Sequence, residues 1–286
     1  MFYKKNKAIK EDEIIIDGVP EKKDNSIRIM SFNLRYCDDK AGSVDDRSRI
    51  SSAIIKQYEP DSLGVQEATG RWLDILDTAL GDKYAYIGQA RDTGGYKSER
   101  SAVFYLKDKY KLIDEGTIWL SETPEVKYTK SFDSNCFRVA SWAVLENKKT
   151  GERYTHLNTH LDHILEETRV CQIEVFIRKL AELQKNGCVF CTGDFNAEEE
   201  SRVYARMAEV TDDARATASQ SDGGITFHDY GKALKAGNLG GIIDYIFVPK
   251  GAKVERFKII RNTFGGMYPS DHFPIIADII TEEDIK

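Results

Sequence analysis

The stretch "NGCVFCTGDFNAEEES", residues 186–201, contains the strongest structural signal in the chain. Residues 189–191 are a short apolar run, which is typical of a strand buried on both faces. The run stops at a Thr-Gly pair, and Asp194 and Asn196 follow it two residues apart. An Asp or Asn after a strand commonly closes a turn or caps a helix. Alone, the stretch predicts a buried strand with a polar tip.

Alternating and helical patterns divide the rest of the chain into many strands and a few helices. Pro60 closes the first helical pattern, and Gly81 and Gly187 follow the second and third. Strands without strict βαβ alternation indicate two packed mixed sheets flanked by helices. We expect helices over about 45–58, 69–80 and 165–186, a hairpin over 137–163, and strands over 26–36, 61–67, 84–88, 101–106, 188–194, 224–230, 241–248, 255–262 and 273–280.

Length and composition indicate a single domain. The chain has 286 residues, of which 41% are hydrophobic, and no Pro/Gly/Ser-rich linker divides it. A chain of this length can bury a large core as one unit. We expect one domain over residues 26–282, after an N-terminal extension over 1–25 in which the apolar residues 14–16 form one short strand.

Charge and cysteine usage disfavour several classes of protein. The formal net charge is -6, whereas a protein that grips long duplexes through phosphates is usually basic. No stretch approaches the roughly 20 apolar residues of a membrane span, and we do not expect the charged N-terminal segment, which has no apolar h-region, to act as a secretory signal. Five scattered cysteines predict reduced thiols and a cytoplasmic protein. Cys188 and Cys191 would point to opposite strand faces, so we expect core cysteines rather than a metal pair.

Polar residues recur where the apolar strands begin or end. Each has an ordinary explanation, since an acid can cap a helix and a histidine can be half-buried in a core. Asp244 is harder to explain, because it lies within the apolar run "IIDYIF" and a buried carboxylate is costly unless paired or bound to metal. Together these residues predict one polar site at the edge of a double sheet: Asn33, Glu67, His160, His163, Asp194, Asn196, Asp244, Asp271 and His272.

This set of side chains suits the hydrolysis of a phosphate ester. Carboxylate and amide oxygens favour Mg²⁺ or Mn²⁺, and the set lacks the thiolate–imidazole cluster of a structural zinc site. Hydrolysis needs charge neutralisation on the phosphate, an aligned water and stabilisation of the leaving oxygen. A metal with Asn and His, an Asp, and a second His can meet these three needs. A histidine paired with a carboxylate stays protonated above its ordinary pKa of about 6.5.

The motifs resemble those of the endonuclease/exonuclease/phosphatase superfamily. The segments "IMSFNLRY", "VQE", "NTHLDH", "TGDFNAEEES", "IDYIFV" and "SDHFPI" occur in that family's order and lie within residues 27–277. The segments "TIWLSETP" and "NTHLDH" most resemble a bacterial branch near the deadenylase-like members. The resemblance implies a four-layer α/β/β/α sandwich and a single catalytic domain, 26–282, which is a monomer by default.

The resemblance also implies a role for each motif residue. Glu67 would hold the divalent ion, with Asn33 and Asp271 at or beside it. The remaining residues would act on the water and the phosphate. Asp194 would orient or deprotonate the water, and Asn196 would bind the scissile phosphate. Asp244 would keep His272 cationic, and His160 would donate to a phosphate oxygen or the leaving group.

Residues outside the central motifs bear on substrate choice. Arg100, Arg138 and His163 could add substrate contacts, although arginines at such positions are also ordinary surface residues. Trp119 could stack on a base, but it fits better as a packing residue. Ile242 stands where relatives often carry an Arg, and the insert 228–241 could be a flap or, more simply, a Gly-containing loop.

Three functions remain open from the sequence. The first is a Mg²⁺- or Mn²⁺-dependent phosphodiesterase that cleaves short or single-stranded nucleic acid. The second is a phosphatase or phosphodiesterase for a small phosphorylated metabolite or lipid head group. The acidic net charge slightly favours a small or short substrate, whereas the family resemblance favours nucleic acid. The third, a binding protein that kept the fold but lost turnover, has the least support because the catalytic set is complete.

Overall fold

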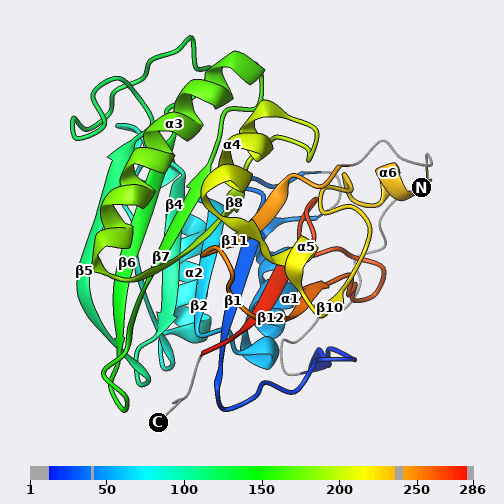
Figure 1. The fold of residues 1–286 in the computed structure, drawn as a ribbon. Helices are drawn as coiled ribbons and strands as arrows, with labels where there is room; N and C mark the ends of the chain where they lie inside the picture. Colours follow the sequence, from blue (N-terminus) through cyan, green and yellow to red (C-terminus); the bar gives the residue numbers. More distant parts are fainter. Residues whose placement is uncertain (1–12, 40–41, 236–240, 282–286) are drawn as a thin grey trace.

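Two mixed β-sheets form the centre of the molecule (Figure 1). The computed structural model describes residues 13–39, 42–235 and 241–281. The first sheet has the order β10 (Gln220–Ser221), β12 (Val254–Ile259), β13 (Ile275–Ile280), β1 (Ser26–Asn33), β2 (Ser62–Ala68), β4 (Arg100–Leu106) and β3 (Tyr84–Ile87). The second has the order β5 (Tyr110–Trp119), β6 (Val139–Asn147), β7 (Arg153–His160), β8 (Cys188–Asp194), β11 (Asp244–Val248) and β9 (Asp212–Asp213).

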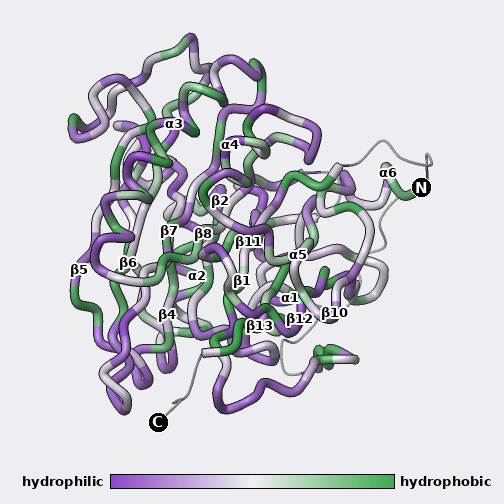
Figure 2. Tube along the Cα trace, in the orientation of Figure 1, coloured by the Kyte–Doolittle hydropathy of each residue, from purple (hydrophilic) through white to green (hydrophobic). Residues whose placement is uncertain are grey.

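Helices cover the outer face of each sheet. Apolar side chains fill one layer between the first sheet and the first two helices, one between the sheets, and one between the second sheet and the next two helices. Figure 2 shows hydrophobic residues on the central strands and hydrophilic ones on many of the loops. The predicted four-layer sandwich is confirmed. Its helices are α1 (Val44–Tyr58), α2 (Gly70–Leu80), α3 (Glu166–Leu183), α4 (Arg202–Val210), α5 (Ala214–Thr217) and α6 (Lys232–Lys235), with 3₁₀ turns η2 (Gly95–Lys97) and η3 (Gln184–Asn186).

Helix α1 is well defined at both ends and anchors a loop of the later site. The Ser43 hydroxyl caps it by accepting a hydrogen bond from the Asp46 amide, and Glu59 ends it in the left-handed conformation just before Pro60. From inside the helix, the buried Arg47 guanidinium donates to the carbonyls of Leu34, at 2.7 Å, and Cys37, at 2.7 Å. The loop after β1 is thereby fixed to the helix.

One predicted strand is absent from the structure, and one long strand of the structure is not predicted. Residues 224–230 do not form a strand: only a single bridge joins Phe227 to His272, and His228 instead stacks on Phe273 with ring centroids 3.8 Å apart. The ten-residue strand β5 is missing from our expectations. It is an edge strand whose middle, 114–116, is polar and exposed or half-exposed, so its sequence lacks the alternation that identifies a half-buried strand.

The cysteine and N-terminal predictions are also corrected in part. Cys191 is a core residue, but Cys188 is exposed at the first position of β8, so the prediction of two core cysteines is wrong for Cys188. Residues 14–16 form no strand. Ile14 and Ile16 are buried in the α1 core, and the Gln57 side chain bonds the carbonyl of one and the amide of the other. The domain boundaries at 26 and 282 stay a prediction.

A buried polar network crosses from one sheet to the other. His156 on β7 bonds the hydroxyl of Ser62 on β2 at 2.7 Å and the hydroxyl of Thr192 on β8 at 2.7 Å. Beside it, the Asn158 amide donates to the Val65 carbonyl across the sheet interface at 2.9 Å. A Cβ on Gly64 would lie 2.1 Å from the Thr192 hydroxyl oxygen, so the close approach of the sheets requires glycine here.

The position of His156 predicts a loss of stability in acid. Complete burial lowers the pKa of His156 to about 3, so the folded state holds it neutral while the unfolded state protonates it below about pH 6.5. This contribution is full above pH 6.5 and falls as the pH drops toward 3. Between pH 7 and 5 the His156 term should cost about 2 kcal/mol of unfolding free energy.

Urea unfolding at pH 7 and pH 5 measures this term. His156→Gln should be less stable than wild type at pH 7, and its own loss of stability between the two pH values should be smaller by about 2 kcal/mol. Equal losses in the two proteins would show that His156 is not the buried neutral group we describe.

Candidate active site

Strand direction brings the predicted polar residues to one end of the sandwich. Strands β1 and β2 are parallel, as are β7 and β8, so their carboxyl ends at Asn33, Glu67, His160 and Asp194 meet at corresponding edges. The neighbouring strands β4, β6, β11 and β13 run antiparallel, so they begin at this end. The register places Asp194 directly opposite both His160 and Asp244.

Asp194 lies at the centre of the site and contacts both halves of the sandwich. Its Oδ2 accepts a hydrogen bond from Asn33 Nδ2 at 2.9 Å and lies 3.4 Å from His160 Nε2 and 3.7 Å from His272 Nε2. Its Oδ1 accepts from the Asn196 backbone amide at 2.9 Å. The residue is almost fully buried. One carboxylate therefore connects a strand of the first sheet, two strands of the second and the segment before β13.

Glu67 reaches the site through an irregularity in its strand. The pairing of β2 with β4 shifts between Val65 and Ala68, and Glu67 within this bulge has φ of 59°, in the left-handed region. A bulge redirects a side chain that regular alternation would point elsewhere. The Glu67 carboxylate accepts from Asn33 Nδ2 at 3.2 Å and from the Tyr36 amide at 2.9 Å. Asn196 is also left-handed, with φ of 48°, a conformation that Asn tolerates.

The backbone at Glu67 predicts an unusual order of variant stabilities. A side chain with a Cβ pays about 1–2 kcal/mol in the left-handed region, whereas glycine does not. In urea unfolding with EDTA present, Glu67→Gly should therefore be more stable than Glu67→Ala by about 1 kcal/mol. At an ordinary strand position glycine is the less stable variant, so the reverse order would refute backbone strain at this residue.

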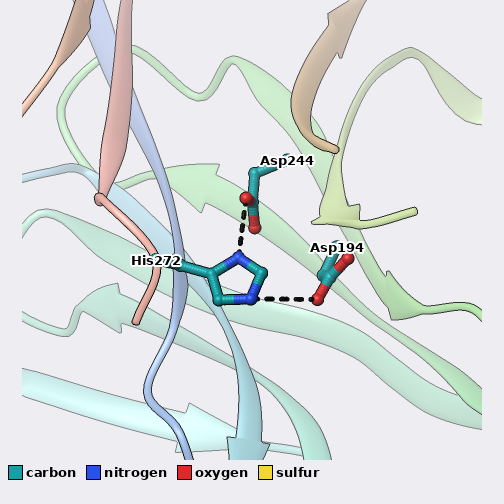
Figure 3. Close-up of side chains that lie close together, drawn as sticks. All are labelled: Asp194, Asp244 and His272. Atoms are coloured by element: carbon teal, nitrogen blue, oxygen red, sulfur yellow. Dashed lines mark hydrogen bonds and ion pairs between the residues drawn. The ribbon is translucent and has the colours of Figure 1, made fainter. Parts of the chain in front are cut away.

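Asp244 and His272 form a buried ion pair. His272 Nδ1 lies 2.8 Å from Asp244 Oδ2, and the opposite ring nitrogen faces Asp194 (Figure 3). Burial alone would lower the pKa of His272, but Asp244 and then Asp194 outweigh it and raise the pKa to about 10. The imidazole is thus a fixed cation at neutral pH, as predicted for a histidine paired with a carboxylate.

Burial acts in the opposite sense on the central carboxyl. It raises the pKa of Asp194 to about 7, against the His272 cation and the hydrogen bonds from Asn196 and Asn33, which lower it. The two effects point in different directions because Asp194 is enclosed but also faces a cation. Burial prevails and the pKa is raised, because enclosure is complete and the His272 cation is already shared with Asp244. Asp194 is therefore poised to exchange a proton near neutral pH.

His160 differs from His272 in charge. Burial, then the neighbouring Arg138 cation, hold the pKa of His160 well below its ordinary value. At neutral pH it is a neutral imidazole that offers one N–H donor. The two histidines beside Asp194 thus supply one fixed positive charge and one neutral hydrogen bond.

Asp271 lies beside the site rather than in its hydrogen-bond network. It accepts from the Ser270 hydroxyl at 3.1 Å, and its other oxygen lies 3.6 Å from Arg35 Nε. Burial lowers the pKa of Arg35, but Asp271 and then Glu67, two of the three predicted metal residues, outweigh it and raise the pKa above its ordinary value. Arg35 is absent from the sequence predictions, because no motif distinguishes it from a surface arginine.

The possible metal ligands fall into two groups. One is Glu67 and Asp271 with Asn33, which offers hard oxygen donors. The other is Asp194, Asp244 and His272, whose candidate ligand atoms all lie within 4.8 Å of one another and of which Asp244 Oδ1 is buried without a partner among the described residues. An ion in the second group would require His272 to give up its proton, since a metal binds the neutral imidazole.

The predicted specificity residues lie along one rim. Arg100 and Arg138 line a small cavity together with Glu67 and His160, and Arg138 Nη2 lies 3.2 Å from Nδ1 of the exposed His163. Two further cavity residues, Arg91 and Glu99, are absent from the sequence predictions. Arg91 lies in a loop and Glu99 directly precedes β4, and no sequence pattern marks the ion pair between them.

Trp119 and Ile242 are packing residues. Trp119 is buried and donates its indole N–H to the Arg91 carbonyl, so the base-stacking alternative is wrong. Ile242 packs on the core of the second sheet. Of the insert 228–241, residues 236–240 lie outside the described part of the chain. The described part of the insert contains α6, and the carbonyl of its last residue, Gly241, accepts a hydrogen bond from the Thr226 amide.

This arrangement is that of a phosphoesterase of the α/β/β/α sandwich type. The chain matches the endonuclease/exonuclease/phosphatase family over residues 30–272, and it belongs to that family. None of the curated proteins matches it. No helix in residues 13–39, 42–235 and 241–281 is long and apolar enough to cross a membrane.

Solved structures of bacterial proteins share this fold over most of the chain. An endonuclease/exonuclease/phosphatase protein from Bacteroides vulgatus is 33% identical, with a TM-score of 0.84 over 90% of this chain and 99% of that one. A mannosyl-6-phosphatase from Bacteroides thetaiotaomicron is 29% identical, with a TM-score of 0.83 over 90% and 100% of the two chains. The human Nocturnin catalytic domain, 21% identical with a TM-score of 0.68 over 91% and 96%, shares the fold.

Proposed function

We propose that the protein is a Mg²⁺- or Mn²⁺-dependent hydrolase that cleaves the phosphate ester of a small molecule. The observation that carries this proposal is the position of Asp194, a buried carboxyl held between the His272 cation and the His160 imidazole, beside Glu67. Few structural roles need two histidines and two further acids around one buried carboxyl. Attack on a phosphate needs a base, positive charge and hydrogen-bond donors together.

The oxygen donors near Glu67 fit a hard divalent ion. Glu67 and Asp271 would hold it, and the Asn33 amide, which donates to both Glu67 and Asp194, would orient the ligand. When bound, such an ion neutralises charge on the phosphate oxygens and on the leaving group.

The protein residues account for the remaining parts of the reaction. A water attacks phosphorus as its proton passes to Asp194, a new P–O bond forms, and the ester P–O bond breaks in line with the attack. The leaving oxygen departs with the bonding electron pair and takes a proton from solvent. His272, held cationic by Asp244, and the His160 N–H would stabilise the phosphate oxygens, and Asn196 would bind the phosphate.

Two observations favour a small substrate over nucleic acid. The structurally similar protein from Bacteroides thetaiotaomicron is a mannosyl-6-phosphatase, which acts on a phosphorylated sugar unit. The net charge of -6 also disfavours a long polyanion. We therefore place a small phosphorylated carbohydrate or similar metabolite first and a short nucleic acid second. A lipid head group and an inactive binding protein follow.

Replacement of the central carboxyl tests the proposed chemistry. Asp194→Asn keeps the shape but cannot accept the proton of the water, so kcat should fall about a thousandfold on any ester that the wild type cleaves. The assay screens phosphorylated sugars, p-nitrophenyl phosphate and short oligonucleotides with Mg²⁺ and Mn²⁺. Asp212→Asn, a carboxylate paired with Lys250 at the second sheet's edge, is the matched control.

The outcomes separate the three candidate functions. Turnover of oligonucleotides in preference to small esters would replace our substrate class. Turnover in Asp194→Asn above about a tenth of wild type would refute Asp194 as the base. Binding of Mn²⁺ without turnover of any ester by the wild type would support the inactive binding protein.

Calorimetric titration of Mn²⁺ distinguishes the two groups of possible metal ligands. If the ion is held at Glu67, Glu67→Gln should weaken Mn²⁺ binding by about 10- to 100-fold, since one charged ligand is lost. Asp244→Asn removes only the partner of His272 and should change the affinity far less. The reverse order would place the ion among Asp194, Asp244 and His272.

A further inference from the structure

A small cavity opens beside the catalytic residues, on the side of Glu67 and His160. It has a volume of about 10 Å³ and is lined also by Arg91, Glu99 and Arg138. This is room for about one water-sized atom. The cavity can therefore receive a single oxygen atom of a group that sits in the adjoining site.

Arg138 in this cavity is a buried cation that forms no ion pair with any carboxylate in the described part of the chain. The residue is 5% exposed, its Nε is buried without a hydrogen-bond partner in the described chain, and its side chain's sole hydrogen bond to a described residue is to the His163 ring at 3.2 Å. The pKa of Arg138 is lowered, first by burial and then by the Arg91 cation, so these surroundings disfavour its charge. A buried charge of this kind is costly unless something pairs with it.

The other buried arginines show how the chain satisfies this residue type. Arg28 is paired with Asp278 at 2.6 Å, and Arg47 donates to several backbone carbonyls, including that of Leu34 at 2.7 Å. Two carboxylates line the cavity, but Glu99 is already bonded to Arg91 at 2.5 Å, and Glu67 accepts from Asn33 at 3.2 Å. Arg138 thus differs from both in having no oxygen partner among the described residues.

We propose that Arg138 and this cavity receive the third non-bridging oxygen of a terminal phosphate, which makes the enzyme a phosphomonoesterase. A monoester carries about -1.5 to -2 charge at neutral pH and has three unsubstituted oxygens, whereas a diester has two and a single charge. The Arg138 guanidinium pairs with the additional charge, and a second ester chain would take the place of the oxygen atom that this small cavity receives. This inference rests on the proposed function and names its substrate class.

The experiment compares two substrates with the same leaving group, p-nitrophenyl phosphate and methyl p-nitrophenyl phosphate, with Mg²⁺ at pH 8. Wild type should prefer the monoester. Arg138→Gln should lower kcat/KM for the monoester by about 30-fold and that for the diester by less than about threefold, because the lost charge-assisted contact exists only with the monoester. Arg153→Gln, an exposed arginine at the far end of β7, is the control.

Two results would overturn the inference. One is a wild-type preference for the diester, and the other is an equal fall in kcat/KM for both substrates in Arg138→Gln. If Arg138→Gln does not fold, the test instead compares how strongly methyl phosphate and dimethyl phosphate inhibit the wild type. Methyl phosphate should inhibit at a concentration about 30-fold lower, and equal inhibition would overturn the inference.

Binding separates this inference from the proposed function. If wild type cleaves neither substrate, the proposed function fails, yet titration with inorganic phosphate still tests the cavity. Phosphate should bind wild type about 30-fold more tightly than Arg138→Gln. Equal affinities would overturn the inference whatever the turnover.

Discussion

The structure of the site depends on one buried carboxyl group, Asp194, and on what surrounds it. Placing a carboxyl between two sheets is unfavourable unless donors meet its oxygens, and here Asn33 comes from the first sheet while Asn196 follows β8. The same carboxyl faces His160 and His272. Because its partners come from both sheets and from the segment before β13, the sandwich must close correctly before any of them can act.

The polar network beneath the site explains how the sheets keep their relative position. An apolar interface can slide, because the hydrophobic effect has no direction. The bonds of His156 to Ser62 and Thr192 are directional, and the glycine at 64 lets the sheets approach closely enough to form them. The strands that carry Glu67 and Asp194 are thereby held in register where their ends meet.

Much of the fold and part of the site could be predicted from the sequence. Strand ends at Asn33, Glu67, His160 and Asp194 are visible as polar residues after apolar runs, and strand direction then brings them together. The charge state of each histidine could be predicted less well. Asp244 keeps His272 cationic in spite of burial, whereas burial and then the nearby Arg138 lower the pKa of His160 and keep it neutral. Neither Asp244 nor Arg138 is adjacent in the chain to the histidine that it affects. Arg35, the Arg91–Glu99 pair and the left-handed Glu67 depend on tertiary contacts that leave no periodic signal.

The proposed chemistry requires that the two histidines beside Asp194 differ in protonation state, and nuclear magnetic resonance can observe both. In metal-free protein labelled with ¹⁵N-histidine at pH 8, the account predicts that both ring nitrogens of His272 are protonated, with a pKa near 10, and that the ring of His160 is neutral. In Asp244→Asn the His272 pKa should fall. A neutral His272 at pH 8 in the wild type would contradict the arrangement on which the proposed chemistry depends.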